Sequence, residues 1–422
     1  MNIIVLVVDR LHTGFLGCYG NAWVATPHFN RLAAEGFVFD QAFVDHPDLA
    51  ELCRSWWTGT HYLQRESRAE APPMLVERFS ESGFTTTCLT DEPAVAGHPL
   101  AARFDEVVRI GHAAGDDPLA ASGDTMAESV EQTQLAQFFA AAMQALEQPR
   151  EPFLLWLHSR GMGGAWNAPF EFRRQYADEE EAEPPRIVVP PCRYLGETDD
   201  PDELWGLCQA YAAQVSLVDE CLGGLLEMLE EQLVSDTALV VLGARGFPLG
   251  RNRRLGGVDQ ALYGELVQTA WLVRLPDAAG AMARSEALVQ PGDLMPTLLE
   301  LSRLSDSAPA PDHSPRSLLP VIRDDLTWRR DRICLANESG ERACRTPAWY
   351  LRLPAPRPTL DEGPSPELFG KPDDRWEVND VAQRCPEIVA AMRAAHDELA
   401  RSLAAREGEL PALDELLASD LR

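Results

Sequence analysis

An unbroken apolar strand signal at the start of the chain constrains its fold more than any other feature. Residues 2–8 read Asn-Ile-Ile-Val-Leu-Val-Val, and comparable runs follow at 152–158 and 238–243. Strands that are apolar on both faces are typical of parallel sheets, in which helices cover each side. Helical patterns separate these runs, including those at 124–147 and 203–231. We therefore predict an α/β fold with a large, mostly parallel sheet flanked by helices.

The pattern changes in the last quarter of the chain. Residues 305–314 are rich in Ser, Pro, Ala and Asp, a composition that is typical of a linker. Short strand signals and a long helical pattern at 385–405 follow. This change predicts a main α/β domain at 1–330 and a small C-terminal α+β subdomain with a long helix at 331–422.

Charge and cysteine content exclude several kinds of partner. The 422 residues carry 66 acidic and 37 basic side chains, for a net charge of −29. Nucleic acid and anionic membrane surfaces require a basic face, so we predict neither as a partner. The nine cysteines show no spacing typical of zinc sites or of a disulfide framework. With no signal peptide and no apolar run long enough to cross a bilayer, we predict a cytoplasmic protein with reduced thiols.

Several ordered segments are similar to one known family. Residues 16–20 read LGCYG, residues 26–36 read TPHFNRLAAEG, and residues 42–59 read AFVDHPDLAELCRSWWTG. These resemble the sulfatase family of the alkaline-phosphatase superfamily, whose signature has an A-[FY]-V-x-x-P lead-in, C/S-x-P-S-R and a later T-G. The resemblance covers essentially the whole chain. It implies the alkaline-phosphatase-like fold and hydrolysis of sulfate esters by a formylglycine made from Cys or Ser. It also implies a calcium ion held by aspartates, with Lys, Arg and His stabilising the developing charge.

The signature region lacks the residues that this chemistry needs. Counting forward from Pro47 or backward from Gly59 places Leu49 at the position of the nucleophile, and an isobutyl group cannot attack sulfur. The signature arginine falls on Cys53, with Arg54 one residue later. A shifted nucleophile at Cys53, Ser55 or Thr58 stays open as an alternative, although each of these residue types also packs or caps helices.

The resemblance places the metal ligands on residues that mostly cannot bind calcium. Asp9 keeps the first carboxylate, but the second aspartate position is Arg10, and the second metal pair falls on Ala244 and Arg245. His158 matches the family's catalytic-side histidine, although a strand-end histidine is more often a structural residue. Two interpretations follow for the arginines: an ion-pair cluster that closes a lost metal site, or a pocket that binds an anion without cleaving it.

These losses predict a sulfatase-family protein that is catalytically inactive and acts in binding or scaffolding. Lys371 is the only lysine in the sequence. This near-absence of lysine does not depend on how the chain is aligned with the family. We predict no cofactor, and calcium would be the family's ion if any metal binds. The partner would be an anionic small molecule or a protein, and the sequence does not specify the oligomeric state. The alternative is a divergent hydrolase of sulfate or phosphate esters with a rearranged active site built around Asp9 and His158.

Overall fold

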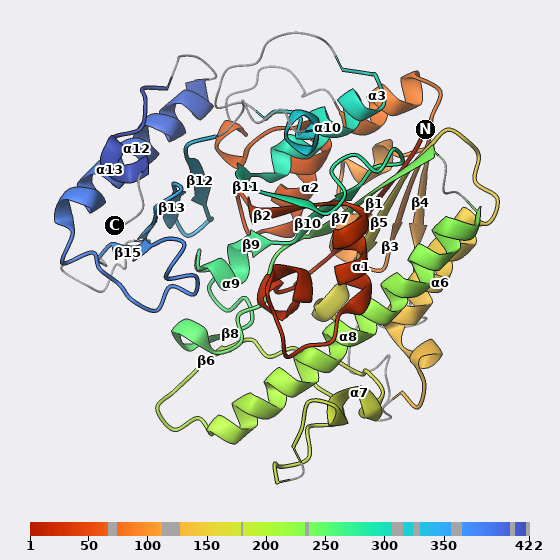
Figure 1. Cartoon of the computed structure of the whole chain (residues 1–422), viewed down its shortest axis with the longest axis horizontal. Helices are drawn as coiled ribbons and strands as arrows, with labels where there is room; N and C mark the ends of the chain where they lie inside the picture. Colours follow the sequence, from red (N-terminus) through yellow and green to blue (C-terminus); the bar gives the residue numbers. More distant parts are fainter. Residues whose placement is uncertain are drawn as a thin grey trace. The chain divides into compact units, whose positions relative to one another are not determined.

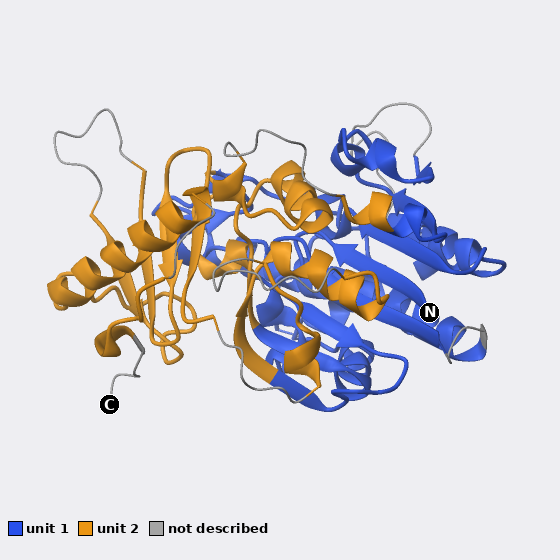
Figure 2. Ribbon diagram, turned by 90° about the horizontal axis from the view of Figure 1, so that it is seen from above, with its two compact units in different colours: residues 1–40, 79–258, 269–284 blue, residues 41–78, 259–268, 285–422 orange. Residues whose placement is uncertain are grey.

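The computed structural model describes residues 1–65, 74–111, 127–178, 180–232, 236–305, 315–323, 330–355, 365–405 and 410–418. These residues fall into two compact units, shown in different colours in Figure 2. Unit 1 comprises residues 1–40, 79–258 and 269–284, and unit 2 comprises 41–78, 259–268 and 285–422. The predicted linker at 305–314 lies outside the described residues apart from Ser305. The predicted division at residue 330 stays a prediction.

A large mixed sheet contains most of the strands (Figure 1). Its order is β11-β2-β10-β7-β1-β5-β3-β4, with β9 beside β2. The pairs that β1 makes with β5 and β7 are parallel, as are those of β3 with β4 and β5, whereas β10 runs antiparallel to β7. The prediction of a large, mostly parallel sheet is therefore confirmed. The strands are β1 (Asn2–Val8), β2 (Phe37–Phe43), β3 (Thr85–Thr90), β4 (Glu106–Arg109), β5 (Phe153–Ser159), β7 (Thr237–Gly243), β9 (Gln268–Thr269), β10 (Trp271–Arg274) and β11 (Ala283–Val289).

Helices of unit 1 cover the face of the sheet that bears Ile4, Leu6 and Val8. Apolar side chains of α1, α6 and α8 form one buried cluster with these three residues. This is the arrangement that doubly apolar strands require, because each face must be shielded from water. The unit also holds a short β6–β8 pair. Its helices and short strands are α1 (Pro27–Glu35), α4 (Pro93–Ala96), α6 (Gln134–Leu146), α7 (Phe170–Arg174), α8 (Pro201–Gln232), β6 (Arg193–Tyr194) and β8 (Arg254–Leu255).

The helix predicted at 124–147 is shorter than expected. It is observed as α6 from Gln134, and residues 127–133 contain only a 3₁₀ turn at Val130–Gln132. The reason is a capping residue: the Thr133 hydroxyl accepts a hydrogen bond from the Ala136 N–H at 3.1 Å. An N-cap has non-helical backbone angles and so fixes the start of the helix. Residues before 127 lie outside the described part of the chain.

Unit 2 contains a separate four-stranded antiparallel sheet with the order β12-β13-β14-β15. Helix α12 packs on it through Ile388, Met392 and Ala395. Among the described residues, no helix is long and apolar enough to cross a membrane. The elements of the unit are α2 (Leu49–Thr58), α3 (Leu75–Glu81), α9 (Gly264–Val267), α10 (Leu294–Leu301), α11 (Leu319–Ile322), β12 (Ile333–Ala336), β13 (Arg342–Arg345), β14 (Trp349–Leu353), β15 (Glu367–Gly370), α12 (Pro386–Ala405) and α13 (Glu415–Ala418).

Candidate functional site

Three strands of unit 1 end together at one edge of the sheet. In the parallel register Val8 lies beside Ser159 of β5 and Gly243 of β7. The residues that follow β1 and β7 therefore meet the end of β5. This edge brings together Asp9, Arg10, His158, Ala244 and Arg245, all of which were candidates from the sequence. The carboxyl edge of a parallel sheet is where α/β proteins bind ligands.

Asp9 and Arg245 form a bidentate ion pair. Arg245 Nε donates to Asp9 Oδ1 at 3.0 Å, and Nη2 donates to Oδ2 at 3.0 Å. The Asp9 side chain is 1% exposed and that of Arg245 is 16% exposed. Burial opposes ionisation of the carboxyl group, but the charges of Arg245 and Arg10 outweigh it and hold the pKa of Asp9 below its usual value. Both carboxylate oxygens are thus occupied by a guanidinium group.

Arg10 adds a second positive charge beside Asp9. Its backbone N–H donates to Asp9 Oδ1 at 2.9 Å, and its Nε lies 3.8 Å from Asp9 Oδ2. Its φ of 60° is in the left-handed region, which is uncommon for a residue with a side chain. The Tyr211 hydroxyl from α8 donates to the Arg10 carbonyl at 2.6 Å and accepts from His12 N–H at 2.8 Å. Packing on α8 therefore fixes this backbone conformation.

His158 is a neutral side chain inside the same cluster. It is fully buried, and burial lowers its pKa to about 4, although the charge of Asp9 opposes this shift. At neutral pH the imidazole is therefore uncharged and lacks the second proton that a general acid would donate. Its carbonyl accepts a hydrogen bond from the Thr90 hydroxyl at 2.7 Å, which ties the end of β5 to β3.

Sequence reasoning missed Arg160 as part of this edge. Its backbone N–H donates to Asp91 Oδ1 at 2.6 Å, and its Nε lies 3.6 Å from Glu92 Oε2. A Cβ atom placed on Gly163 would lie 3.2 Å from Arg160 Cγ and 3.6 Å from Arg10 Cζ, so both arginines flank this glycine. Burial raises the pKa of Asp91 to about 7. The available signal was position, since Arg160 follows a strand-end histidine by two residues.

The signature region belongs to unit 2, where Leu49 is the first residue of α2. Asp48 caps this helix, and its Oδ1 accepts from the N–H groups of Ala50 and Glu51 at 2.9 and 3.2 Å. Leu49 is 4% exposed and Cys53 is fully buried. The Arg54 Nε donates to Glu51 Oε2 at 2.7 Å, one helical turn away. The segment that resembles the family signature is thus a capped helix with a buried apolar face and a local ion pair.

Two of the alternative nucleophiles, Ser55 and Thr58, are engaged in local hydrogen bonds. The Ser55 hydroxyl is buried and donates to Asp45 Oδ2 at 2.7 Å. The Thr58 hydroxyl donates to the Arg54 carbonyl in the preceding turn, also at 2.7 Å. Lys371, the only lysine in the sequence, has its Nζ 2.8 Å from Glu377 Oε1 and donates to the Asp374 carbonyl. Each of these groups has a structural role within unit 2.

The residues at the sheet edge do not fit a calcium ion. Calcium takes six to eight oxygen ligands, mostly carboxylates and carbonyls. The two carboxylate oxygens of Asp9 face Arg245, and Ala244 offers no side-chain oxygen. Within the described ranges no three His, Cys, Asp or Glu side chains converge in a way that could hold a metal.

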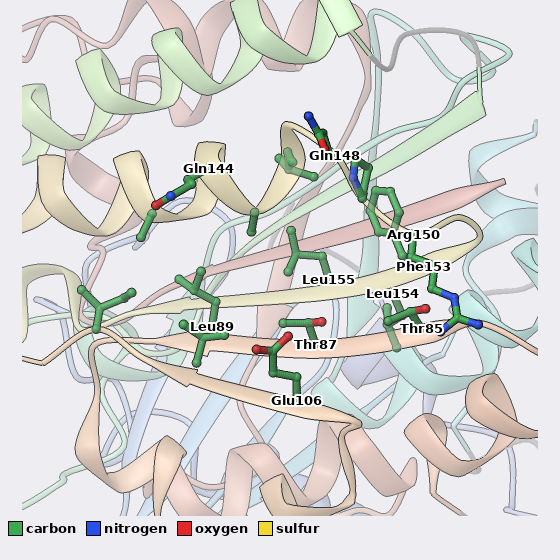
Figure 3. Close-up of a pocket in the computed structure, with 16 residues that line it drawn as sticks. Thr85, Thr87, Leu89, Glu106, Gln144, Gln148, Arg150, Phe153, Leu154 and Leu155 are labelled. Carbon is green, nitrogen blue, oxygen red and sulfur yellow. The ribbon is translucent and has the colours of Figure 1, made fainter.

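A cavity of about 450 Å³ lies elsewhere in unit 1 (Figure 3). It is lined by β3, β4, β5, α6 and the residues that follow α6, including Leu89, Leu155, Gln144 and Glu106. None of the cluster residues Asp9, Arg10, His158 and Arg245 lines it. The cavity and the sheet-edge cluster are therefore separate features.

Comparison with known proteins identifies the family. The family model for sulfatases matches residues 1–304. N-acetylgalactosamine-6-O-sulfatase of Bacteroides thetaiotaomicron is 34% identical over 89 residues, which are 21% of this chain and 16% of that protein. Steryl-sulfatase of Rattus norvegicus is 36% identical over 81 residues, or 19% of this chain and 14% of the relative. The matched stretches thus span less than a fifth of these curated relatives.

Solved structures agree over nearly the whole chain. Phosphonate monoester hydrolase of Agrobacterium radiobacter has a TM-score of 0.73 at 18% identity, covering 96% of this chain and 95% of that one. A 2-O GAG sulfatase has a TM-score of 0.70 at 18% identity, and the match covers 97% of this chain and 94% of that one. At such identities the likeness establishes the fold alone. The family model covers well over half of the sequence and shows that this chain belongs to the sulfatase family.

Proposed function

We propose that this sulfatase-family chain does not hydrolyse sulfate esters by the family's mechanism and acts instead as a binding or scaffolding protein. The observation that carries the proposal is the bidentate Asp9–Arg245 pair, in which a guanidinium neutralises the carboxylate that should bind the metal. The apolar Leu49 at the nucleophile position supports it independently. Fold does not imply activity, because activity depends on the side chains of the site. A cytoplasmic location remains part of this proposal.

The ligand chemistry that fits the sheet edge best is a small oxyanion. Arg10 is 34% exposed and lies 3.8 Å from its carboxylate partner, and Arg160 is 28% exposed and lies 3.6 Å from its own. These separations leave guanidinium N–H groups that can donate to a sulfate or phosphate group. Arg245 and Arg54 are less suitable, because Asp9 and Glu51 already accept their hydrogen bonds at 3.0 and 2.7 Å.

An activity assay tests the first part of the proposal. Purified protein would be incubated with aryl sulfate and aryl phosphate esters, with and without calcium or manganese, beside an Asp9→Ala variant. We expect no turnover above that of the variant under any of these conditions. Turnover that disappears in Asp9→Ala would show instead that a divergent hydrolase site has formed around Asp9.

Calorimetric titration with inorganic sulfate and phosphate tests the ligand class. We expect binding by the wild-type chain that is lost in Arg160→Gln and retained in Arg186→Gln, since Arg186 is a surface residue with 66% of its side chain exposed. Equal binding by both variants would refute an anion site at the sheet edge. It would leave the inactive scaffold as the proposal.

A further inference from the structure

A pair of partly exposed tryptophans lies outside the sheet-edge cluster in unit 1. The indoles of Trp23 and Trp205 stack with ring centroids 5.0 Å apart and an interplanar angle of 24°. They are 38% and 41% exposed, although side chains of this size and apolarity are usually mostly buried. Folding has therefore placed two large aromatic faces together at the surface. We call Trp23, Trp205, Tyr176 and Glu181 the aromatic platform.

Buried contacts hold the platform in place from below. Trp23 packs edge to face on Tyr176 at 5.2 Å and on Phe15 at 6.2 Å. Tyr176 is 6% exposed, and its hydroxyl accepts from Ala25 N–H at 3.1 Å and shares a hydrogen bond with Ser216 of α8. The loop that carries Trp23 and the helix that carries Trp205 are thus bound to the same tyrosine. A surface that is ordered before binding loses less entropy when a partner docks.

A carboxylate is built into the edge of the platform. Glu181 Oε1 accepts from Trp205 Nε1–H at 2.8 Å, and its Oε2 accepts from Gln209 Nε2–H at 2.7 Å and from Asp178 N–H at 3.1 Å. The hydrogen bond from Trp205 is the main reason that the pKa of Glu181 lies below its usual value. Glu181 is therefore ionised at neutral pH. An anion that accepts the indole N–H also increases the electron density of the ring, which strengthens the attraction of its face for a cation.

The surrounding sequence is strongly acidic. Residues 178–205 contain ten acidic side chains and only two basic ones, Arg186 and Arg193. Arg193 already pairs with Asp199 and lies 3.5 Å from Glu203, and Arg186 lies 4.0 Å from Glu183. The local potential is consequently negative, and it attracts cationic groups toward the platform.

We propose that the aromatic platform docks a cationic segment of a partner protein by receiving an arginine side chain on the exposed part of the Trp205 ring that Trp23 does not cover. A guanidinium group is planar and weakly hydrated, so it stacks on an indole while it donates hydrogen bonds to a neighbouring carboxylate. Glu181 supplies that carboxylate at the ring edge. Tryptophan and arginine are also the residues most enriched where protein interfaces gain their binding energy. This proposal uses none of the residues of the sheet-edge cluster.

Titration with synthetic peptides tests the platform. The probe is a short flexible peptide with two arginines between glycines and serines, compared with the same peptide carrying glutamine in place of arginine. Binding would be measured at about 150 mM salt, where long-range attraction is screened. We expect binding of the arginine peptide, and affinity about fivefold weaker for Trp205→Ala, as the loss of about 1 kcal/mol of cation–π attraction implies. Trp205→Phe should bind with intermediate affinity, because it keeps an aromatic face and loses the N–H to Glu181.

A matched pair of charge variants separates the platform from general acidity. Glu181→Gln and Glu227→Gln each remove one negative charge. Glu227 is exposed on α8 and lies about 33 Å along the helix from Trp205, so it is far from the platform. Glu181→Gln should weaken binding several-fold, and Glu227→Gln should leave it unchanged. The proposal is overturned if wild-type protein does not bind the arginine peptide, or binds the glutamine peptide equally well. It is also overturned if Trp205→Ala binds like wild type, or if the two charge variants behave alike.

Discussion

At the scale of single residues, Asp9 shows how a buried carboxylate at a strand end is neutralised within the chain. A buried carboxylate needs a positive partner, because an isolated charge in a protein interior is costly. In this chain Arg245 fills that requirement with two parallel hydrogen bonds, and the backbone N–H of Arg10 adds a third. The carboxylate therefore keeps a counter-charge at the end of β1, supplied by side chains of the chain itself.

We expect the Asp9–Arg245 ion pair to contribute to the free energy of unfolding. Asp9→Ala or Arg245→Ala should each lower the free energy of unfolding by about 3 kcal/mol, because each leaves a partly buried charge without its partner. The double variant should lose clearly less than the two single losses combined. Urea unfolding measures all three. Arg186→Ala is the control, since its exposed pair with Glu183 should contribute less than about 1 kcal/mol. Losses below that level for Asp9→Ala would contradict a buried ion pair.

We expect the stability difference between wild type and Asp91→Asn to depend on pH. Burial raises its pKa to about 7, so the folded state keeps a proton that the unfolded chain releases above about pH 4. The stabilisation that protonated Asp91 contributes to the folded state is therefore complete at low pH and is lost as the pH rises toward 7. Asp91→Asn mimics the protonated form. Its free energy of unfolding should rise by about 1 to 2 kcal/mol relative to that of wild type as the pH is raised from about 5 to about 7.5.

Chemical unfolding of wild type and Asp91→Asn at several pH values measures the difference in their free energies of unfolding. His158 has the opposite effect, because its lowered pKa of about 4 makes stability rise with pH between about 4 and 6.5. Its contribution is common to wild type and variant, so it cancels when the two are subtracted. A difference that stays constant with pH would contradict a raised pKa at Asp91.

At the scale of elements, the turn after β5 decides how closely the strand ends approach. Gly161 has a φ of +53°, and a Cβ atom there would lie 2.3 Å from the Asp9 carbonyl oxygen. Met162 N–H donates to that same carbonyl at 3.2 Å. The glycine thus allows the backbone after β5 to cross directly against the backbone after β1. The turn therefore maintains the close approach of the two strand ends at the sheet edge.

Gly161→Ala should therefore destabilise the protein by about 2 kcal/mol or more, through both the positive φ and the clash with backbone. The matched control is Gly257→Ala, because nothing lies within 4 Å of the added Cβ and the residue is exposed. Thermal unfolding of the two variants should show a lowered midpoint only for Gly161→Ala. Equal midpoints would mean that the turn can move away from Asp9 without cost.

At the scale of the whole molecule, the family's fold is retained over the full length while its metal chemistry is not supported by the residues present. A ligand that binds only the folded state raises the unfolding midpoint by mass action. We therefore expect the midpoint in millimolar calcium to equal that in chelator within about 1 °C, whereas an occupied site would raise it by several degrees. Differential scanning calorimetry measures this directly. A clear rise with calcium would mean that oxygen ligands assemble in solution despite Arg245.

Much of this organisation could be predicted from the sequence. The continuous apolar runs at 2–8 and 238–243 specify buried parallel strands, because only a sheet covered on both faces can use them. The residue types at Asp9, Arg10 and Arg245 could also be read from their positions relative to these strands. Parallel pairing then placed them at one edge, as expected for strands that run in the same direction.

What the sequence alone determined is the family, the fold class and the residue types that follow the strands, since these depend on local pattern and residue type. Only the tertiary structure decided which partner each charge takes. Arg245 rather than Arg10 makes the two-pronged pair with Asp9, and Arg160, a residue without a motif, joins the cluster through Asp91 and Glu92. The reason is geometric: ion pairing depends on side-chain reach and direction across strands that lie far apart in the sequence, and these follow from register and packing.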